Sequence, residues 1–141
     1  MPDGVDVLFV CQHGAAKSVI AARHLVELAQ ARGLVLDASA AGVEPDEEIP
    51  PHVIAGLRDD GVDFDGAPPQ AVTRELVENA RIVVSFGCDL SAFAGESTRI
   101  VHWSGVPAVS DGYEAARTDI VSRLNAILDE ADQRAGQQRR E

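Results

Sequence analysis

The chain has 141 residues and a formal net charge of -11, from 23 acidic and 12 basic residues. This balance argues against nucleic acid or an anionic membrane surface as a partner, because both are bound through clustered Lys and Arg. A hydrophobic share of 45% is enough for one core, and aromatic residues contribute only 4% of the chain. Lys17 is the only lysine among the basic residues.

Two cysteines, Cys11 and Cys88, are too few for a disulfide-stapled scaffold. Neither has a second Cys or His at zinc-ligand spacing, so we expect no metal and no bound cofactor. The first residues have no basic region, and the apolar run that follows is too short for a signal peptide or a membrane span. We therefore expect a reduced, cytoplasmic setting.

The first predicted elements form a strand, helix and strand. Residues 5–10 are an apolar run with β-branched side chains, which is typical of a buried strand. From Ser18 the apolar spacing becomes helical and continues to about residue 32, where Gly33 predicts the end of the helix. Residues 34–40 predict a second strand. This order indicates a βαβ unit and a parallel sheet.

The rest of the chain predicts shorter elements and one long helix. In chain order these are a loop at 41–51, a helix at 52–60, a helix through about 79 with Thr73 as its N-cap, strands at 81–86 and 98–102, and a helix from Tyr113. Together they predict a single three-layer α/β domain over residues 1–135. Its four-stranded, mainly parallel sheet has helices on both faces, and residues 136–141 form a frayed polar tail.

Residues 11–18 lie between the carboxyl end of the first strand and the start of a helix, where open α/β sheets bind their ligands. Backbone N–H groups at a helix start converge on one spot and, with the helix dipole, form an anion site. The same field stabilises a thiolate, which makes Cys11 a candidate nucleophile. The expected oxyanion-binding residues are Gln12, His13, Gly14, Ala15, Ala16, Lys17 and Ser18.

The residue types in this loop suit such a site. The small residues at 14–16 leave the backbone open to an oxyanion, Lys17 adds a positive charge, and the Ser18 hydroxyl can donate to the thiolate or cap the helix. The alternative is a buried strand-end thiol followed by a solvated lysine. The coincidence of all these features favours a functional loop. A nucleotide P-loop is rejected, because it needs glycines where the chain has Cys11 and an alanine.

The run Val7-Leu8-Phe9-Val10-Cys11, the loop after it and the helix from Ser18 resemble the low-molecular-weight protein tyrosine phosphatases and the arsenate reductases that share their fold. The resemblance extends over about residues 7–128 and implies the phosphotyrosine protein phosphatase I-like fold. The family has Cys, five residues, Arg and Ser, so Lys17 stands at the Arg position. A lysine cannot hold an oxyanion through two parallel donors, which implies weaker transition-state binding.

The resemblance to the phosphatases implies a general acid from an Asp-Pro pair before the last helix. Here Val106 precedes the proline, and the expected Asp is absent. Asp111 is the nearest substitute, and an N-cap for the final helix is the alternative role for this residue.

The resemblance to the arsenate reductases implies a second thiol that attacks the covalent Cys11 adduct, releases arsenite and forms a disulfide. Cys88 stands in a Gly-Cys pair after a strand, as in those enzymes, and His102-Trp103 is also reductase-like. Their usual third cysteine is missing, and an external thiol could replace it. The alternative for Cys88 is a buried strand-end thiol.

The sequence therefore predicts a cysteine-thiolate enzyme of the arsenate reductase type, which converts arsenate to arsenite with a thioredoxin or a low-molecular-weight thiol as reductant. In this hypothesis Cys11 is the nucleophile, Lys17 and Ser18 assist it, and Cys88 or a soluble thiol resolves the adduct. One alternative is a phosphatase that hydrolyses phosphomonoesters through a phosphocysteine, with Asp111 as acid. Another is a relative that binds phosphate or arsenate without turnover.

Overall fold

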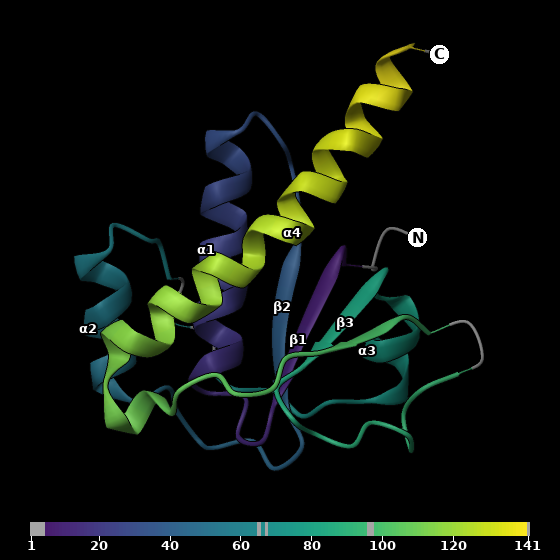
Figure 1. The fold of residues 1–141 in the computed structure, drawn as a ribbon. Coiled ribbons are helices and arrows are strands. Elements are labelled where there is room, and N and C mark those ends of the chain that lie inside the picture. The colour runs from purple at the N-terminus through teal and green to yellow at the C-terminus, as the bar shows by residue number, and fades with distance from the viewer. Residues whose placement is uncertain (1–4, 65, 67, 96–97, 141) are drawn as a thin grey trace.

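The computed structural model of the protein describes residues 5–64, 66, 68–95 and 98–140. Its sheet has four strands in the order β2-β1-β3-β4, and each neighbouring pair is parallel (Figure 1). The strands are β1 (Val7–Cys11), β2 (Ala38–Gly42), β3 (Ile82–Ser85) and β4 (Ile100–His102). The predicted α/β fold is thus confirmed, with a fully parallel sheet where we expected a mainly parallel one.

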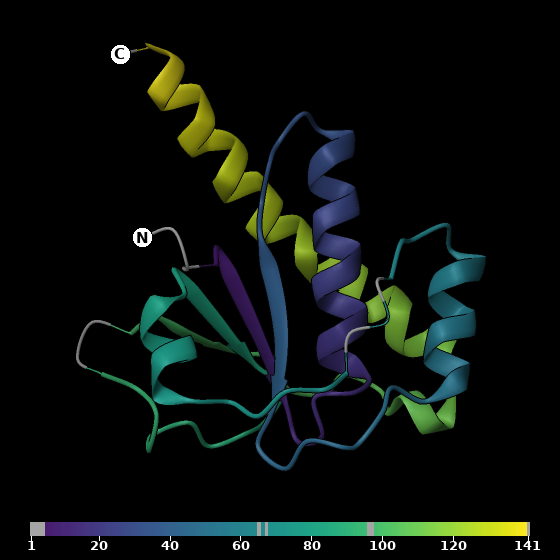
Figure 2. The ribbon, with the colours of Figure 1, turned by 180° about the vertical axis from the view of Figure 1, so that it is seen from behind.

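Helices cover both faces of the sheet, as the sequence predicts. They are α1 (Lys17–Ala31), α2 (Pro51–Asp59), α3 (Arg74–Asn79), the 3-10 helix η1 (Val109–Asp111) and α4 (Tyr113–Arg140). Helices α1, α2 and α4 contribute to the core on one face, and α3 packs on the other (Figures 1 and 2). This is a three-layer arrangement. The predicted N-cap of α3 is confirmed, since Thr73 Oγ1 accepts a hydrogen bond from Leu76 N at 3.1 Å.

Strand β1 lies between β2 and β3 and is buried along its whole length. Phe9 faces the core beneath α1 and α4, whereas Leu8 and Val10 face the cluster beneath α3. Burial on both faces explains the uninterrupted apolar run that the sequence shows here. The strand therefore fixes its last residue, Cys11, at the carboxyl edge of the sheet.

The second strand begins later than predicted. Residues 34–36 are apolar enough for a strand, but β2 starts at Ala38, which pairs with Val7 at the beginning of β1. Residues before Ala38 therefore lie beyond the end of their neighbour and have no strand to pair with. The pairing, and not the apolar run, sets the start of this strand.

Helix α4 is longer than predicted, because it continues to Arg140 through the region where we expected a frayed tail. Its side chains Ile127, Ala131 and Ala135 pack against the core and support the last turns. Residues 1–4 of the predicted domain and Glu141 of the predicted tail lie outside the described residues. In the described part of the chain, no helix is both long and apolar enough to cross a membrane.

Candidate active site

Cys11 ends β1 at the carboxyl edge of the sheet, and α1 begins six residues later at Lys17. One group of the intervening turn and one of the first turn of α1 contact the sulfur. Gly14 N donates to Cys11 Sγ at 3.2 Å, and Ser18 Oγ lies 3.0 Å from the same atom. Ser18 is fully buried, so its hydroxyl is held against the sulfur. A negative charge on this sulfur would receive two hydrogen bonds, as a nucleophilic thiolate requires.

The segment that follows β2 forms backbone hydrogen bonds with the loop that begins at Cys11. Backbone N–H groups of Val43, Glu44 and Asp46 donate to the carbonyls of Cys11, Gln12 and His13, at 3.3, 2.8 and 3.1 Å respectively. With these carbonyls occupied on one side, the N–H of the following Gly14 turns toward the sulfur. The loop is therefore fixed with a backbone donor at the Cys11 sulfur, an arrangement typical of strand-to-helix loops that bind anions.

Gly14 is required by its conformation and by its surroundings. Its φ of 61° lies in the left-handed region that favours glycine. A Cβ at Gly14 would lie 2.6 Å from Gly42 N, and a Cβ at Gly42 would lie 2.5 Å from Gly14 N. The loop and the end of β2 therefore pack backbone against backbone. The sequence suggested openness toward the oxyanion, and the structure adds this contact with β2.

Two polar side chains of the loop bind the same segment after β2. Gln12 Nε2 donates to a Glu44 carboxylate oxygen. His13 Nδ1 lies 3.2 Å from the Glu44 carbonyl and 3.3 Å from Asp46 Oδ1. The sequence predicts only a loop at 41–51 and does not point to Glu44 or Asp46 as residues that hold the site. The available signal was their place just after β2, because neighbouring parallel strands end at the same edge.

Lys17 is the first residue of α1, and it lines the same cavity as Cys11. No acidic residue stands in the first turn of this helix. Among the described residues, no carboxylate forms an ion pair with the Lys17 ammonium group. The helix dipole and this ammonium thus add positive potential at one point of an acidic protein.

A cavity of about 320 Å³ opens at Cys11. Beyond the loop its walls come from α2, from the end of β3 and from η1, and they include Pro50, His52, Phe86, Ala108, Val109 and Ser110. Phe86 is supported by Trp103, at 5.6 Å between ring centroids, and Trp103 packs on Phe9 at 5.9 Å. An aromatic cluster therefore braces this wall. His52 and Phe86 are wall residues that the sequence did not suggest.

The predicted general acid lies away from the cavity wall. The preceding residues Ala108, Val109 and Ser110 reach the wall, whereas Asp111 is exposed at the end of η1. Asp111 is not the N-cap of α4 either, because Gly112 immediately precedes that helix and its carbonyl accepts from Ala116 N. Val106, at the position where the family has its acid, is buried in the core. Asp46 is the carboxylate that lines the cavity.

Cys88 lies in a different environment. It is buried with apolar side chains beneath α3, on the face of the sheet opposite α1. Its backbone N–H donates to Ser85 Oγ at 2.9 Å, and that hydroxyl donates to the Cys88 carbonyl at 2.8 Å. Burial raises the pKa of the Cys88 thiol, and the negative charge of a Cys11 thiolate raises it further. Both cysteines are free thiols.

The family model described as low molecular weight phosphotyrosine protein phosphatase matches residues 6–92, which is more than half of the chain. The chain therefore belongs to this family. The solved structures that are similar to it include both phosphatases and arsenate reductases, so membership alone leaves the reaction open. A search of curated protein sequences gives no match.

Three solved structures illustrate this range. A thioredoxin-dependent arsenate reductase of Corynebacterium glutamicum is 24% identical with a TM-score of 0.78, over 94% of this chain and 65% of that one. A low molecular weight phosphotyrosine phosphatase of Vibrio cholerae O395 is 18% identical with a TM-score of 0.81, over 93% and 99%. An arsenate reductase of Archaeoglobus fulgidus is 24% identical with a TM-score of 0.69, over 87% and 98%. These likenesses establish the fold.

Proposed function

We propose that the protein is a thiol-dependent arsenate reductase in which Cys11 is the nucleophile. The observation that carries the proposal is the composition of the cavity. It combines a hydrogen-bonded thiol, an anion loop and Lys17, while Val106 is buried and Asp111 stands off the wall. Arsenate reduction depends less on a strong general acid than phosphomonoester hydrolysis does, because the oxygen that leaves arsenate departs as water.

In the first step, Cys11 Sγ attacks the arsenic atom of hydrogen arsenate and forms an S–As bond. The As–OH bond breaks, and the hydroxyl group takes up the proton of the Cys11 thiol and leaves as water. The proposed ligands of the remaining oxygens are the backbone N–H groups of residues 12–18, the Lys17 ammonium group and the Ser18 hydroxyl. In this proposal the Lys17 ammonium group neutralises part of the negative charge of the oxyanion as a single point charge. It does not donate two parallel hydrogen bonds, as an arginine would.

In the second step, a thiolate attacks the sulfur of Cys11. An S–S bond forms and the S–As bond breaks, and the electron pair of the broken bond stays on arsenic, which departs as arsenite. As(V) is thereby reduced, and two thiols are oxidised to a disulfide. Cys88 is poorly suited to this attack because its pKa is raised and its side chain packs beneath α3, on the face of the sheet opposite α1. We therefore assign the step to a soluble low-molecular-weight thiol or a thioredoxin. Such thiols are kept reduced in the cytoplasm, which we propose as the location of the protein.

Phosphomonoester hydrolysis is the second candidate. The wall formed by Pro50, Phe86 and Val109 suits an organic leaving group better than it suits bare arsenate. Asp111 follows this wall by one residue and would supply the proton after a movement of η1. Both reactions would use Cys11 and the anion loop. They differ in the leaving group and in the need for a second thiol.

Parallel assays on one preparation separate the two reactions. We expect arsenite release from arsenate with a soluble thiol or thioredoxin, and little hydrolysis of an aryl phosphate. Both measurements are repeated with Cys11→Ser, which removes the nucleophile, and with Asp111→Asn. Hydrolysis of the aryl phosphate that needs Cys11 and Asp111, without arsenite release, would overturn the proposal in favour of the phosphatase.

A further inference from the structure

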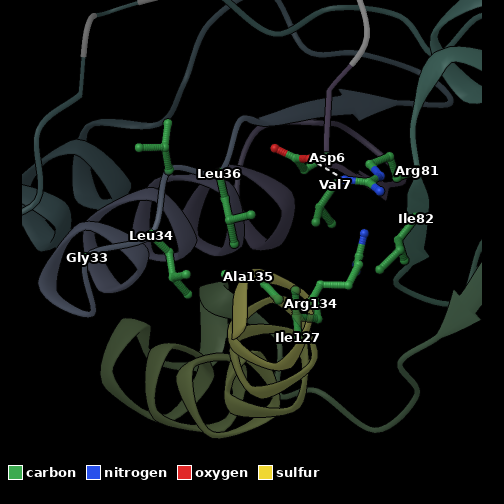
Figure 3. Close-up of a pocket in the computed structure, with 12 residues that line it drawn as sticks. Asp6, Val7, Gly33, Leu34, Leu36, Arg81, Ile82, Ile127, Arg134 and Ala135 are labelled. Atoms are coloured by element: carbon green, nitrogen blue, oxygen red, sulfur yellow. Dashed lines mark ion pairs between the residues drawn. The ribbon is translucent and has the colours of Figure 1, made fainter. Parts of the chain in front are cut away.

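A second cavity, of about 240 Å³, lies at the amino ends of β1 and β3, at the edge of the sheet opposite Cys11. Figure 3 shows the residues that line it. It is bounded by the amino ends of β1 and β3, by the segment between α1 and β2, and by the last turns of α4. None of the residues of the candidate active site belongs to it. A ligand bound here would therefore be independent of the proposed reaction.

The floor of this cavity is apolar and part of the core. Val7, Leu34 and Ile82 are at most 9% exposed, and Ile127 of α4 closes one side. Val35 stands on the rim with 90% of its surface exposed. Burying an exposed apolar side chain such as this one is favourable. The rim therefore favours a ligand with an aliphatic group that covers Val35.

Two guanidinium groups enter the cavity from different elements. Arg81 precedes β3 and Arg134 belongs to α4, and Figure 3 shows both side chains directed into the same end of the cavity. Asp6 is the carboxylate in the lining, and its Oδ1 lies 3.6 Å from Arg81 Nη1. Its other oxygen accepts from Asp37 N at 2.9 Å. Two positive charges and one negative charge thus give the lining a net charge of +1.

Arg134 is only weakly neutralised by its own helix. Its Nη2 lies 3.9 Å from Glu130 Oε1, but Glu130 is held more closely by Arg99, through contacts of 2.8 and 3.2 Å. The hydrogen bonds from Arg99 lower the pKa of Glu130. Because Glu130 is committed to Arg99, the Arg134 charge remains available for an anion in the cavity.

We propose that this cavity binds an amphipathic monoanion, an aliphatic chain that ends in a carboxylate. The single negative charge matches the net +1 of the lining, and the forked Arg81 and Arg134 groups suit the two oxygens of a carboxylate. The chain lies on Val7, Leu34 and Ile82 and covers Val35. A phosphate monoester would carry close to two charges and exceed the charge of the lining.

The proposed ligand connects the last turns of α4 to the sheet. It bridges Arg134 of the helix and Arg81, which precedes β3. Binding therefore stabilises the folded state and raises the midpoint of thermal unfolding as the ligand concentration increases.

Calorimetry and two-dimensional NMR with sodium octanoate test the proposal. We expect saturable binding, with shifts in the amide signals of Val35, Ile127 and Arg134. Acetate, which lacks the chain, and octanol, which lacks the charge, should bind at least about ten-fold more weakly. Equal binding of octanol, or shifts at residues 11–18 that inorganic phosphate reverses, would overturn the proposal. The second result would place octanoate in the active-site cavity.

Variants with equal charge changes complete the test. Arg134→Gln should weaken octanoate binding by about ten-fold or more, because a charge-assisted contact is lost. Arg74→Gln is the matched control, since Arg74 is an exposed arginine on α3 and should leave the affinity unchanged. Undiminished binding by Arg134→Gln would contradict the proposal. A peptide with a free C-terminal leucine that binds more tightly than octanoate would overturn it in favour of a protein terminus.

Discussion

The two cysteines of this protein both follow strands of one parallel sheet, yet their surroundings differ. Cys11 Sγ is contacted by Gly14 N and Ser18 Oγ at the mouth of a cavity, beside Lys17. Cys88 is packed beneath α3, and the Ser85 hydroxyl bonds its backbone N–H and carbonyl. Position at a strand end therefore does not make a thiol reactive. We propose that the donors and charges supplied by the next loop make Cys11 the reactive thiol.

The largest expected effect comes from exchanging each cysteine for serine. Cys11→Ser should lower arsenite formation by at least about a thousand-fold, because it removes the proposed nucleophile. Cys88→Ser should change it by about two-fold or less, since an external thiol performs the second step. Turnover is measured with arsenate and a soluble thiol, and circular dichroism checks that both variants are folded. A loss of similar size in both variants would make Cys88 a partner of Cys11.

A comparison of two glycines tests whether the loop depends on its packing against β2. Gly14→Ala places a Cβ in a left-handed conformation and within 2.6 Å of Gly42 N, so it should destabilise the protein by about 1–3 kcal/mol and also reduce turnover. Gly33→Ala is the matched control, because Gly33 has a φ of 74° and open space around its Cβ position. It should cost about 1 kcal/mol and leave turnover intact.

Urea unfolding and turnover are measured for both glycine variants. Equal turnover in Gly14→Ala and Gly33→Ala would show that the loop tolerates movement at this point. The contact between Gly14 and Gly42 would then be structural only.

The two serines provide a smaller contrast. Ser18→Ala removes a donor from Cys11 Sγ and should lower turnover by about ten- to a hundred-fold, the usual value of a hydrogen bond to a charged group. Ser85→Ala removes bonds to the Cys88 backbone and should reduce stability with little change in turnover. Steady-state kinetics beside thermal unfolding separate the two effects. An unchanged rate in Ser18→Ala would remove this hydroxyl from the proposed mechanism.

The smallest expected effect concerns pH. The folded state raises the pKa of the Cys88 thiol above its ordinary value of 9.0, mainly through burial. The stability that this neutral thiol contributes is present below that value and is lost as the pH rises above it, because the unfolded state releases the proton more readily. Unfolding free energies between about pH 8 and pH 10 should fall less steeply in Cys88→Ala. Identical slopes would mean that Cys88 ionises freely in the folded protein.

Much of the fold could be predicted because its signals are local. The apolar run of β1, the helical spacing from Ser18 and the capping residue Thr73 all act within a few positions. The start of β2 could not be predicted, because it depends on where β1 begins and not on the apolar residues that precede Ala38. The end of α4 depends in the same way on distant packing.

The candidate site also has a part that local sequence predicts and a part that depends on the fold. Residues 11–18 form one local motif, and the sequence predicts an anion loop there from local signals alone. Glu44 and Asp46 hold this loop from the next strand along the edge, and Phe86 reaches the cavity from β3. Asp111 was proposed from its nearness in sequence to the missing acid, whereas the turn of η1 leaves it exposed. Contacts between strand ends and the direction of a turn depend on the whole fold. The local sequence of residues 11–18 therefore cannot predict them.

The most direct test of the proposed reaction is the state of Cys11 after a single turnover. Reduced protein is mixed with arsenate and a small thiol, quenched in acid and analysed by peptide mass spectrometry, with arsenite measured in the same sample. We expect a mixed disulfide between Cys11 and the small thiol, formed only with arsenate and in equal amount to arsenite. Two results would contradict the proposed reaction. One is arsenite release while Cys11 stays unmodified, and the other is undiminished arsenite release by Cys11→Ser.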